Sequence, residues 1–176
     1  VYRSFDQPAS SIVYLYEKGI AINSLSKTYS IPGIRVGWVA SNTEVADILR
    51  DYRDYTMICA GVFDDMVATL VLENKEAILE RNRQFVEENL ALMDAWIAKE
   101  PKASWMRPAS VSTSFVKLDV NRPIEDFALE LLQGYGVLVV PGNRFDKESH
   151  VRIGYCCDKE VLQKGLEKLS QFLNKC

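Results

Sequence analysis

Apolar and polar residues form two kinds of pattern along the chain, one typical of short strands and the other of amphipathic helices. Near the start, the apolar runs 19–22 and 34–40 are each short enough to form a buried strand. About ten residues connect them, fewer than the dozen or more that a parallel crossover needs. We therefore predict that these strands pair antiparallel, preceded by a short helix over 12–18 that Gly19 ends.

Residues 44–99 show the period of amphipathic helices, and we predict three of them, over 44–54, 62–73 and 74–99. Ser41 or Asn42 is placed to cap the first helix. In the third, charged residues interleave with an apolar stripe, which is typical of a solvated helix face. At about 1.5 Å per residue this helix is long enough to cross from one domain to another.

After Pro101 the pattern changes to an α+β arrangement. Short apolar runs predict three strands, and Pro123 followed by acidic residues marks the start of a helix that ends near Gln133. A last amphipathic helix closes the chain. The predicted strands are 114–118, 137–140 and 151–156, and the last helix is 159–174. We place a domain boundary near residue 75, giving domains 1–74 and 75–176.

Composition excludes several classes of protein. The chain has 176 residues, of which 48% are hydrophobic, and a formal net charge of −3. It has no clustered basic face for nucleic acid and no apolar stretch near the ~18 residues that a membrane span needs. Its four cysteines lack metal-ligand spacing. We predict a cytoplasmic protein with reduced thiols and no metal, nucleic-acid or membrane partner.

The segment between the first two strands carries the chemistry. Ser24, Ser26 and Arg35 could bind a phosphate, since arginine presents a planar fork to phosphate oxygens. Lys27 would remain free to form an imine with an aldehyde. An aldehyde that also carries a phosphate suggests pyridoxal phosphate. The alternative is an ordinary solvated loop.

The pattern Ser-x-Ser-Lys, with an arginine eight positions after the lysine, resembles the cofactor-lysine segment of the class I/II aminotransferases, which are fold-type I pyridoxal-phosphate enzymes. The resemblance implies an α/β fold whose large, mainly parallel sheet contains one antiparallel strand, followed by an α+β small domain. It makes Lys27 the catalytic Schiff-base lysine, and Ser24, Ser26 and Arg35 the phosphate ligands. Tyr2 would donate to the phenolic oxygen of the cofactor.

Arg152 is the second candidate, because it interrupts an otherwise apolar strand and a buried charge needs a partner. Val140-Pro141-Gly142, a loop and Val151-Arg152-Ile153-Gly154 resemble the family's small-domain segment, whose arginine binds the substrate α-carboxylate. The alternative is a plain edge-strand arginine. We leave His150 and the loop 143–145 out of the catalytic set.

The resemblance implies transamination between an amino acid and a 2-oxo acid by a homodimer. Alternatives are a β-eliminating lyase of the same fold, a regulator domain and a non-catalytic structural fragment. The family's ring-nitrogen aspartate would fall two positions before Val1. We therefore expect the C-terminal portion of a longer enzyme, which alone is inactive, lacks stoichiometric cofactor and pairs with another copy around residues 1–60.

Overall fold

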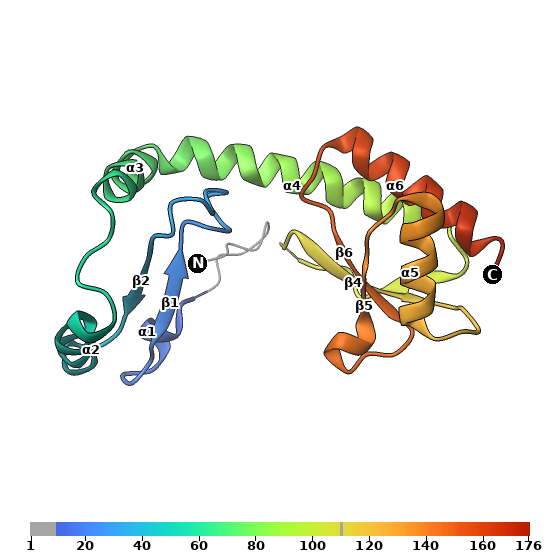
Figure 1. Ribbon diagram of the computed structural model, residues 1–176. Coiled ribbons are helices and arrows are strands. Elements are labelled where there is room, and N and C mark those ends of the chain that lie inside the picture. Colours follow the sequence, from blue (N-terminus) through green and yellow to red (C-terminus); the bar gives the residue numbers. More distant parts are fainter. Residues whose placement is uncertain (1–9, 110) are drawn as a thin grey trace. The chain divides into compact units, whose positions relative to one another are not determined.

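The computed structural model describes residues 10–109 and 111–176, so Tyr2 lies outside the described residues. The chain divides into two compact units, Val1–Gln84 and Phe85–Cys176, with the long helix α4 (Lys75–Ile97) contributing residues to each (Figure 1). No helix in the described part of the chain is long and apolar enough to cross a membrane.

The first unit contains a two-stranded sheet followed by helices. Its elements before α4 are α1 (Ile12–Leu15), β1 (Ala21–Ser24), β2 (Gly37–Ala40), α2 (Thr43–Thr56) and α3 (Val62–Glu73). The two strands pair antiparallel, with Ala21 opposite Ala40 and Ser24 opposite Gly37. The predicted antiparallel pairing is therefore confirmed.

Two boundaries in this unit differ from the sequence prediction. Helix α1 is a single turn rather than seven residues, because the backbone is already extended at Tyr16. Strand β2 begins at Gly37 rather than at residue 34, because Arg35 has a left-handed backbone with φ of 50°. A residue in that conformation cannot continue a strand.

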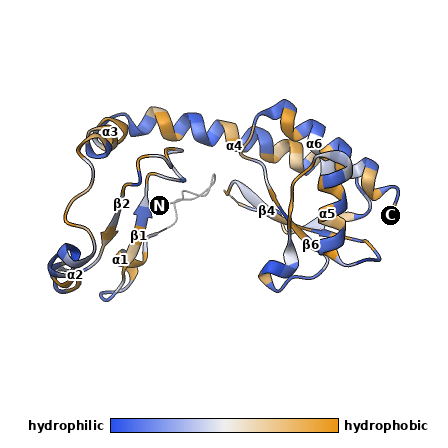
Figure 2. Cartoon of the chain, in the orientation of Figure 1, coloured by the Kyte–Doolittle hydropathy of each residue, from blue (hydrophilic) through white to orange (hydrophobic). Residues whose placement is uncertain are grey.

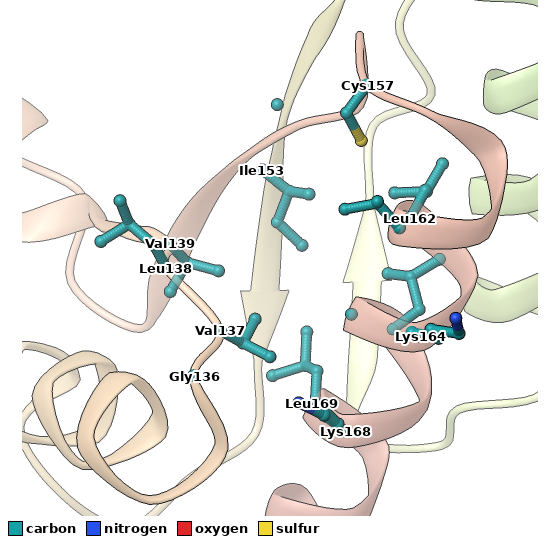
Figure 3. Close-up of a pocket in the computed structure, with 14 residues that line it drawn as sticks. Gly136, Val137, Leu138, Val139, Ile153, Cys157, Leu162, Lys164, Lys168 and Leu169 are labelled. Carbon is teal, nitrogen blue, oxygen red and sulfur yellow. The ribbon is translucent and has the colours of Figure 1, made fainter.

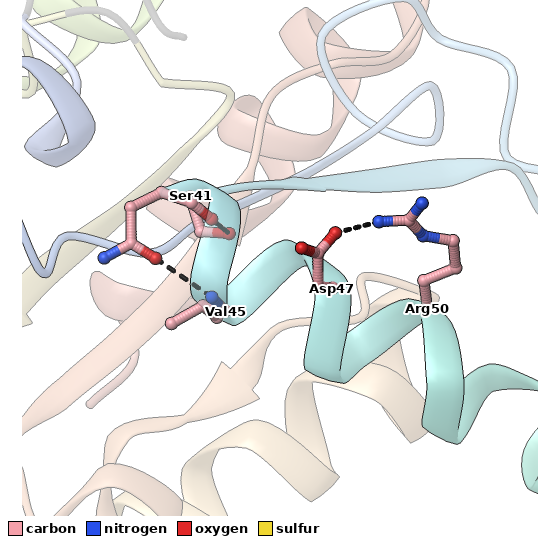
Figure 4. Close-up of polar contacts among 5 residues, drawn as sticks. Ser41, Val45, Asp47 and Arg50 are labelled. Atoms are coloured by element: carbon pink, nitrogen blue, oxygen red, sulfur yellow. Dashed lines mark hydrogen bonds and ion pairs between the residues drawn. The ribbon is translucent and has the colours of Figure 1, made fainter.

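Helix α2 starts as its sequence predicts. The Asn42 side chain accepts a hydrogen bond from the backbone N–H of Val45 at 3.0 Å, which satisfies one of the free donors of the first turn (Figure 4). An exposed ion pair joins Asp47 and Arg50 one turn later (Figure 4). None of the residues of α2 is buried, and most of its large apolar side chains are exposed, as are several on α3. Figure 2 shows the apolar residues along both helices; the exposed ones include Ile48, Leu49, Tyr52, Tyr55, Val62, Phe63 and Met66.

The second unit is an antiparallel sheet of order β3-β4-β6-β5 packed against helices (Figure 1). Its strands are β3 (Ala103–Trp105), β4 (Thr113–Leu118), β5 (Val140–Pro141) and β6 (His150–Gly154), and its helices are α5 (Ile124–Tyr135), the 3-10 turn η1 (Gly142–Phe145) and α6 (Lys159–Leu173). Side chains of the sheet and the helices form a buried core: Val116, Leu118, Phe127, Leu131, Val151, Ile153, Leu166 and Leu169.

The sequence prediction was wrong about one strand here and missed two elements. Residues 137–139 precede the ladder, and only Val140 and Pro141 pair with β6. β3 was missed because three residues are too few to show a period. The turn η1 was missed because its sequence, Gly-Asn-Arg-Phe, carries no helical pattern.

Two buried polar groups hold the end of β6. Asn89 of α4 is 1% exposed, and its amide donates to the carbonyls of Tyr155 and Cys157, both at 2.8 Å. The fully buried Tyr155 donates its hydroxyl to the carbonyl of Val111. Burial raises the pKa of Tyr155 to about 12.

Candidate functional site

The loop after β1 is fixed by one apolar residue that lies between its two serines. Leu25 is fully buried and packs with Ala68 and Val71 of α3. Its N–H donates to Val36 at 3.1 Å and its carbonyl accepts from Ile31 at 3.1 Å. Sequence reasoning missed this role, although an isolated leucine between Ser24 and Ser26 is a visible signal.

The backbone around Lys27 is held on both sides, while the lysine itself is exposed. Ser30 donates its N–H to the Lys27 carbonyl at 3.0 Å and closes a turn in which Ser30 has φ of 58°. The Asn82 side chain of α4 donates to the carbonyl of Thr28 at 3.0 Å. Lys27 is therefore an exposed residue on an anchored turn.

Ser24, Ser26 and Arg35 line a single hollow of about 390 Å³, which residues of β1, of β2 and of the loop that connects them border together. Arg35 donates from Nη1 to the carbonyl of Pro32 at 2.8 Å and to Oγ of Ser26 at 3.4 Å. The N–H of Ser26 donates to Oγ of Ser24 at 3.4 Å. The structure thus brings together the three predicted phosphate ligands. Lys27 is not among the residues that line the hollow, whereas Trp38 is.

Gly37 permits the close approach of β2 to the first serine. A Cβ on Gly37 would lie 2.6 Å from the carbonyl oxygen of Asn23 and 3.2 Å from Cβ of Ser24. Both distances are shorter than ordinary contacts, so a side chain at this position would displace the strand that carries Ser24. Gly33, in the same loop, has open space where its Cβ would stand.

The residues of this hollow fit a phosphate group. Two hydroxyls and a guanidinium supply donors, and no acidic side chain of the described residues forms a salt bridge with Arg35. Because a guanidinium has five N–H donors, its two bonds to the loop leave donors for an anion. The neighbouring amine of Lys27 is the group that can condense with an aldehyde.

In the second unit, Arg152 lies on the face of the sheet opposite the core. It alternates along β6 with the buried Val151 and Ile153, and it pairs across the sheet with Phe115 on β4. Among the described residues, no acidic side chain forms a salt bridge with Arg152. Its guanidinium carbon instead lies 5.2 Å from the ring centroid of Phe145.

The turn η1 is tied to the first turn of α5 by one carboxylate. Glu125 accepts from the Asn143 side chain at 2.9 Å and forms an ion pair with Arg144. These contacts hold the pKa of Glu125 below its usual value, the Asn143 hydrogen bond being the largest cause.

His150, one residue before the core position Val151, bonds through Nδ1 to the carbonyl of Glu148 at 2.8 Å.

A second hollow, of about 290 Å³, lies between residues 136–139 and α6 (Figure 3). Its lining is mainly apolar, with Lys164 and Lys168 as the charged residues that border it. Lys168 is engaged, because its Nζ donates to the carbonyl of Tyr135 at 2.9 Å. Within residues 10–109 and 111–176, none of the predicted site residues lies here.

Comparison with known proteins identifies the family. The family model "Aminotransferase class I and II" matches residues 3–169. The chain belongs to this family. Curated relatives include a capreomycidine synthase of Streptomyces vinaceus, 28% identical over 89% of this chain, and a probable N-acetyl-LL-diaminopimelate aminotransferase of Bacillus subtilis, 28% identical over 98% of this chain.

Solved aminotransferases share the fold. A PLP-dependent aminotransferase from Streptococcus suis is 65% identical, with a TM-score of 0.96 over 99% of this chain, and an aspartate aminotransferase from Thermotoga maritima is 26% identical, with a TM-score of 0.84. The fold-type I α/β architecture is therefore confirmed, and pyridoxal phosphate is the cofactor that the family implies. The chain spans 41% and 44% of the two curated relatives and 47% of the Streptococcus suis chain.

Proposed function

We propose that the full-length protein containing this chain is a pyridoxal-phosphate-dependent aminotransferase, which moves an amino group between an amino acid and a 2-oxo acid. The observation that carries the proposal is the clustering of Ser24, Ser26 and Arg35 around one hollow, next to the anchored turn of Lys27. Family membership supports it.

Each residue has a role in this proposal. Ser24, Ser26 and Arg35 hold the phosphate of the cofactor, Lys27 provides the amine that bonds its aldehyde, and Tyr2 donates to its phenolic oxygen. When bound, pyridoxal phosphate supplies an electron sink for the α-carbon of the substrate. With the cofactor bound, Nζ of Lys27 would take the proton from the α-carbon of the substrate and would be the group that returns it during amino-group transfer.

Arg152 binds the α-carboxylate of the substrate. Two observations support this role: Arg152 is half-buried, and it has no salt bridge among the described residues. A carboxylate matches the planar donors of a guanidinium in a bidentate pair.

The domain assignment follows from the same proposal. Residues 1–74 belong to the C-terminal part of the large cofactor-binding domain, and residues 75–176 to the connecting helix and small domain. The exposed apolar side chains of α2 and α3 are suited to contact with further protein, which supports a homodimer for the full-length enzyme. The chain by itself should lack stoichiometric cofactor and activity. A cytoplasmic location is also proposed, from cysteine usage.

The covalent role of Lys27 can be tested directly. Full-length enzyme is incubated with pyridoxal phosphate, reduced with borohydride and digested, and the modified peptide is identified by mass spectrometry. Modification should fall on Lys27 and disappear in Lys27→Ala, together with the visible absorbance of the bound cofactor. Lys18→Ala, which removes another lysine of the same unit, should change neither. Labelling that survives Lys27→Ala would overturn the assignment.

The reaction type needs a separate assay. An aminotransferase supplied with an amino acid and 2-oxoglutarate forms glutamate and a new 2-oxo acid. A β-eliminating lyase releases ammonia and pyruvate without an acceptor. Production of ammonia in the absence of 2-oxoglutarate, with no glutamate in its presence, would replace transamination by elimination.

A further inference from the structure

The guanidinium of Arg152 has one partner among the interactions described for it, and that partner is aromatic. Its central carbon lies 5.2 Å from the ring centroid of Phe145, within the range of a cation–π contact. An arginine has several rotatable bonds and loses much entropy when it is ordered. A ring against the guanidinium therefore restricts a side chain that no carboxylate of the described residues holds.

We propose that Phe145 is a positioning residue, which holds Arg152 in the orientation that receives the substrate carboxylate. This inference rests on the proposed role of Arg152. Contact through the ring leaves the charge of the guanidinium unneutralised, whereas a protein carboxylate would occupy the same donors as the substrate. Phe145 can thus order Arg152 without competing with substrate.

Phe145 is itself held from two directions. Its ring meets that of Phe115 edge to face, with centroids 5.2 Å apart, and Phe115 lies directly opposite Arg152 in the sheet. Edge-to-face geometry is a favoured arrangement for aromatic pairs. The three side chains therefore form a cluster, defined here as the Arg152 cluster, on the face of the sheet away from the core.

The backbone that carries Phe145 is also fixed. Glu125 binds both Asn143 and Arg144 of η1. At the start of the turn, a Cβ on Gly142 would lie 2.3 Å from the carbonyl oxygen of Lys147 and 2.6 Å from that of His150, so the turn is packed against the chain leading into β6. These contacts place the ring at a defined position relative to the strand that bears Arg152.

The kinetic test uses full-length enzyme with the variants Phe145→Leu and Phe145→Tyr. Phe145→Leu keeps an apolar side chain but removes the ring, and should raise KM for the amino acid about two- to fivefold at nearly constant kcat, the loss expected for one exposed cation–π contact. Phe145→Tyr keeps a ring and should restore KM. Tyr135→Leu removes the cation–π contact that Tyr135 makes with Lys175, and should leave KM unchanged.

A spectroscopic test uses the 176-residue chain and needs no cofactor. The ring of Phe145 should shift the side-chain NMR signals of Arg152 upfield. This shift should vanish in Phe145→Leu and persist in Phe145→Tyr. The shift reports the contact between Phe145 and Arg152 directly. A variant that only loses stability would change signals throughout the second unit, whereas loss of the contact alone would change those of Arg152.

The variant Arg152→Gln distinguishes the carboxylate-binding role of Arg152 from the positioning role of Phe145. If it leaves KM for the amino acid unchanged, the proposed carboxylate role is wrong and the inference falls with it. If Arg152→Gln raises KM at least tenfold but Phe145→Leu changes neither KM nor the Arg152 signals, only the positioning role of Phe145 is overturned.

Discussion

Replacing Asn89 by leucine should destabilise the second unit more than any single surface change. The substitution keeps a side chain of similar size but removes the two donors that bind the carbonyls of Tyr155 and Cys157. A lost neutral hydrogen bond costs about 1 kcal/mol, and a buried group left without a partner costs about 1–3 kcal/mol. Because the Cys157 carbonyl is only partly buried, the expected loss in free energy of unfolding is about 2–4 kcal/mol.

The measurement is urea unfolding followed by tryptophan fluorescence in a Trp38→Phe background, so that Trp96 and Trp105 report the second unit alone. Asn82→Leu is the matched comparison. It removes one hydrogen bond in the other unit, to the carbonyl of Thr28, and should not move this transition. A loss below about 0.5 kcal/mol for Asn89→Leu would show that these two bonds contribute little.

Asn89→Asp gives the same prediction a second readout. The introduced carboxylate would be buried against two carbonyl oxygens, whereas the protonated acid could donate to one of them, so the folded-state pKa of the new carboxyl group is raised above the unfolded value of about 3.9. Stability is then greatest at low pH and is lost as the pH rises through the folded-state pKa. A stability deficit that stays constant between about pH 4 and 8 would refute the reasoning.

Three further predictions concern other groups. The pKa of Tyr155, about 12, lies above the ordinary value of 10.0. The second unit should therefore keep its full stability below pH 10 and lose up to about 1.4 kcal/mol of unfolding free energy per pH unit from there to pH 12. Tyr155→Phe should remove this alkaline loss in urea titrations. Gly142→Ala should lower stability by about 1–3 kcal/mol and raise KM for the amino acid, whereas Gly165→Ala, which has open space around its Cβ, should do neither. Gly37→Ala should weaken cofactor binding to the full-length enzyme in equilibrium dialysis, and an equal effect from the Gly33→Ala control would refute the steric argument.

The sequence predicted what depends on neighbouring residues. The cap at Asn42 and the antiparallel pairing of β1 with β2 follow from local chemistry and loop length. The grouping of the two serines with Arg35 followed from motif spacing. These features involve residues close together in the chain, so a pattern in the sequence can reveal them.

The features that were not predicted depend on distant contacts. The turn of Lys27 is held by Asn82, and the position of Arg152 relative to Phe145 depends on how η1 folds against β6. The run 137–140 is apolar and β-branched enough to predict a strand, yet pairing with β6 begins only at Val140. The extent of the pairing depends on where β6 ends, and the pattern of these four residues carries no information about that.

Burial of Leu25 has a consequence for insertions and deletions in the lysine loop. One residue added between Leu25 and Lys27 would leave the leucine buried but shift the position of every loop residue after it. One residue lost before Leu25 would instead draw a serine toward the apolar core. The spacing of the motif is thus constrained by the burial of Leu25 as well as by the positions that the serines and the lysine need for cofactor binding. Homologues should exchange the residue at position 25 for other apolar ones while keeping its offset from the lysine.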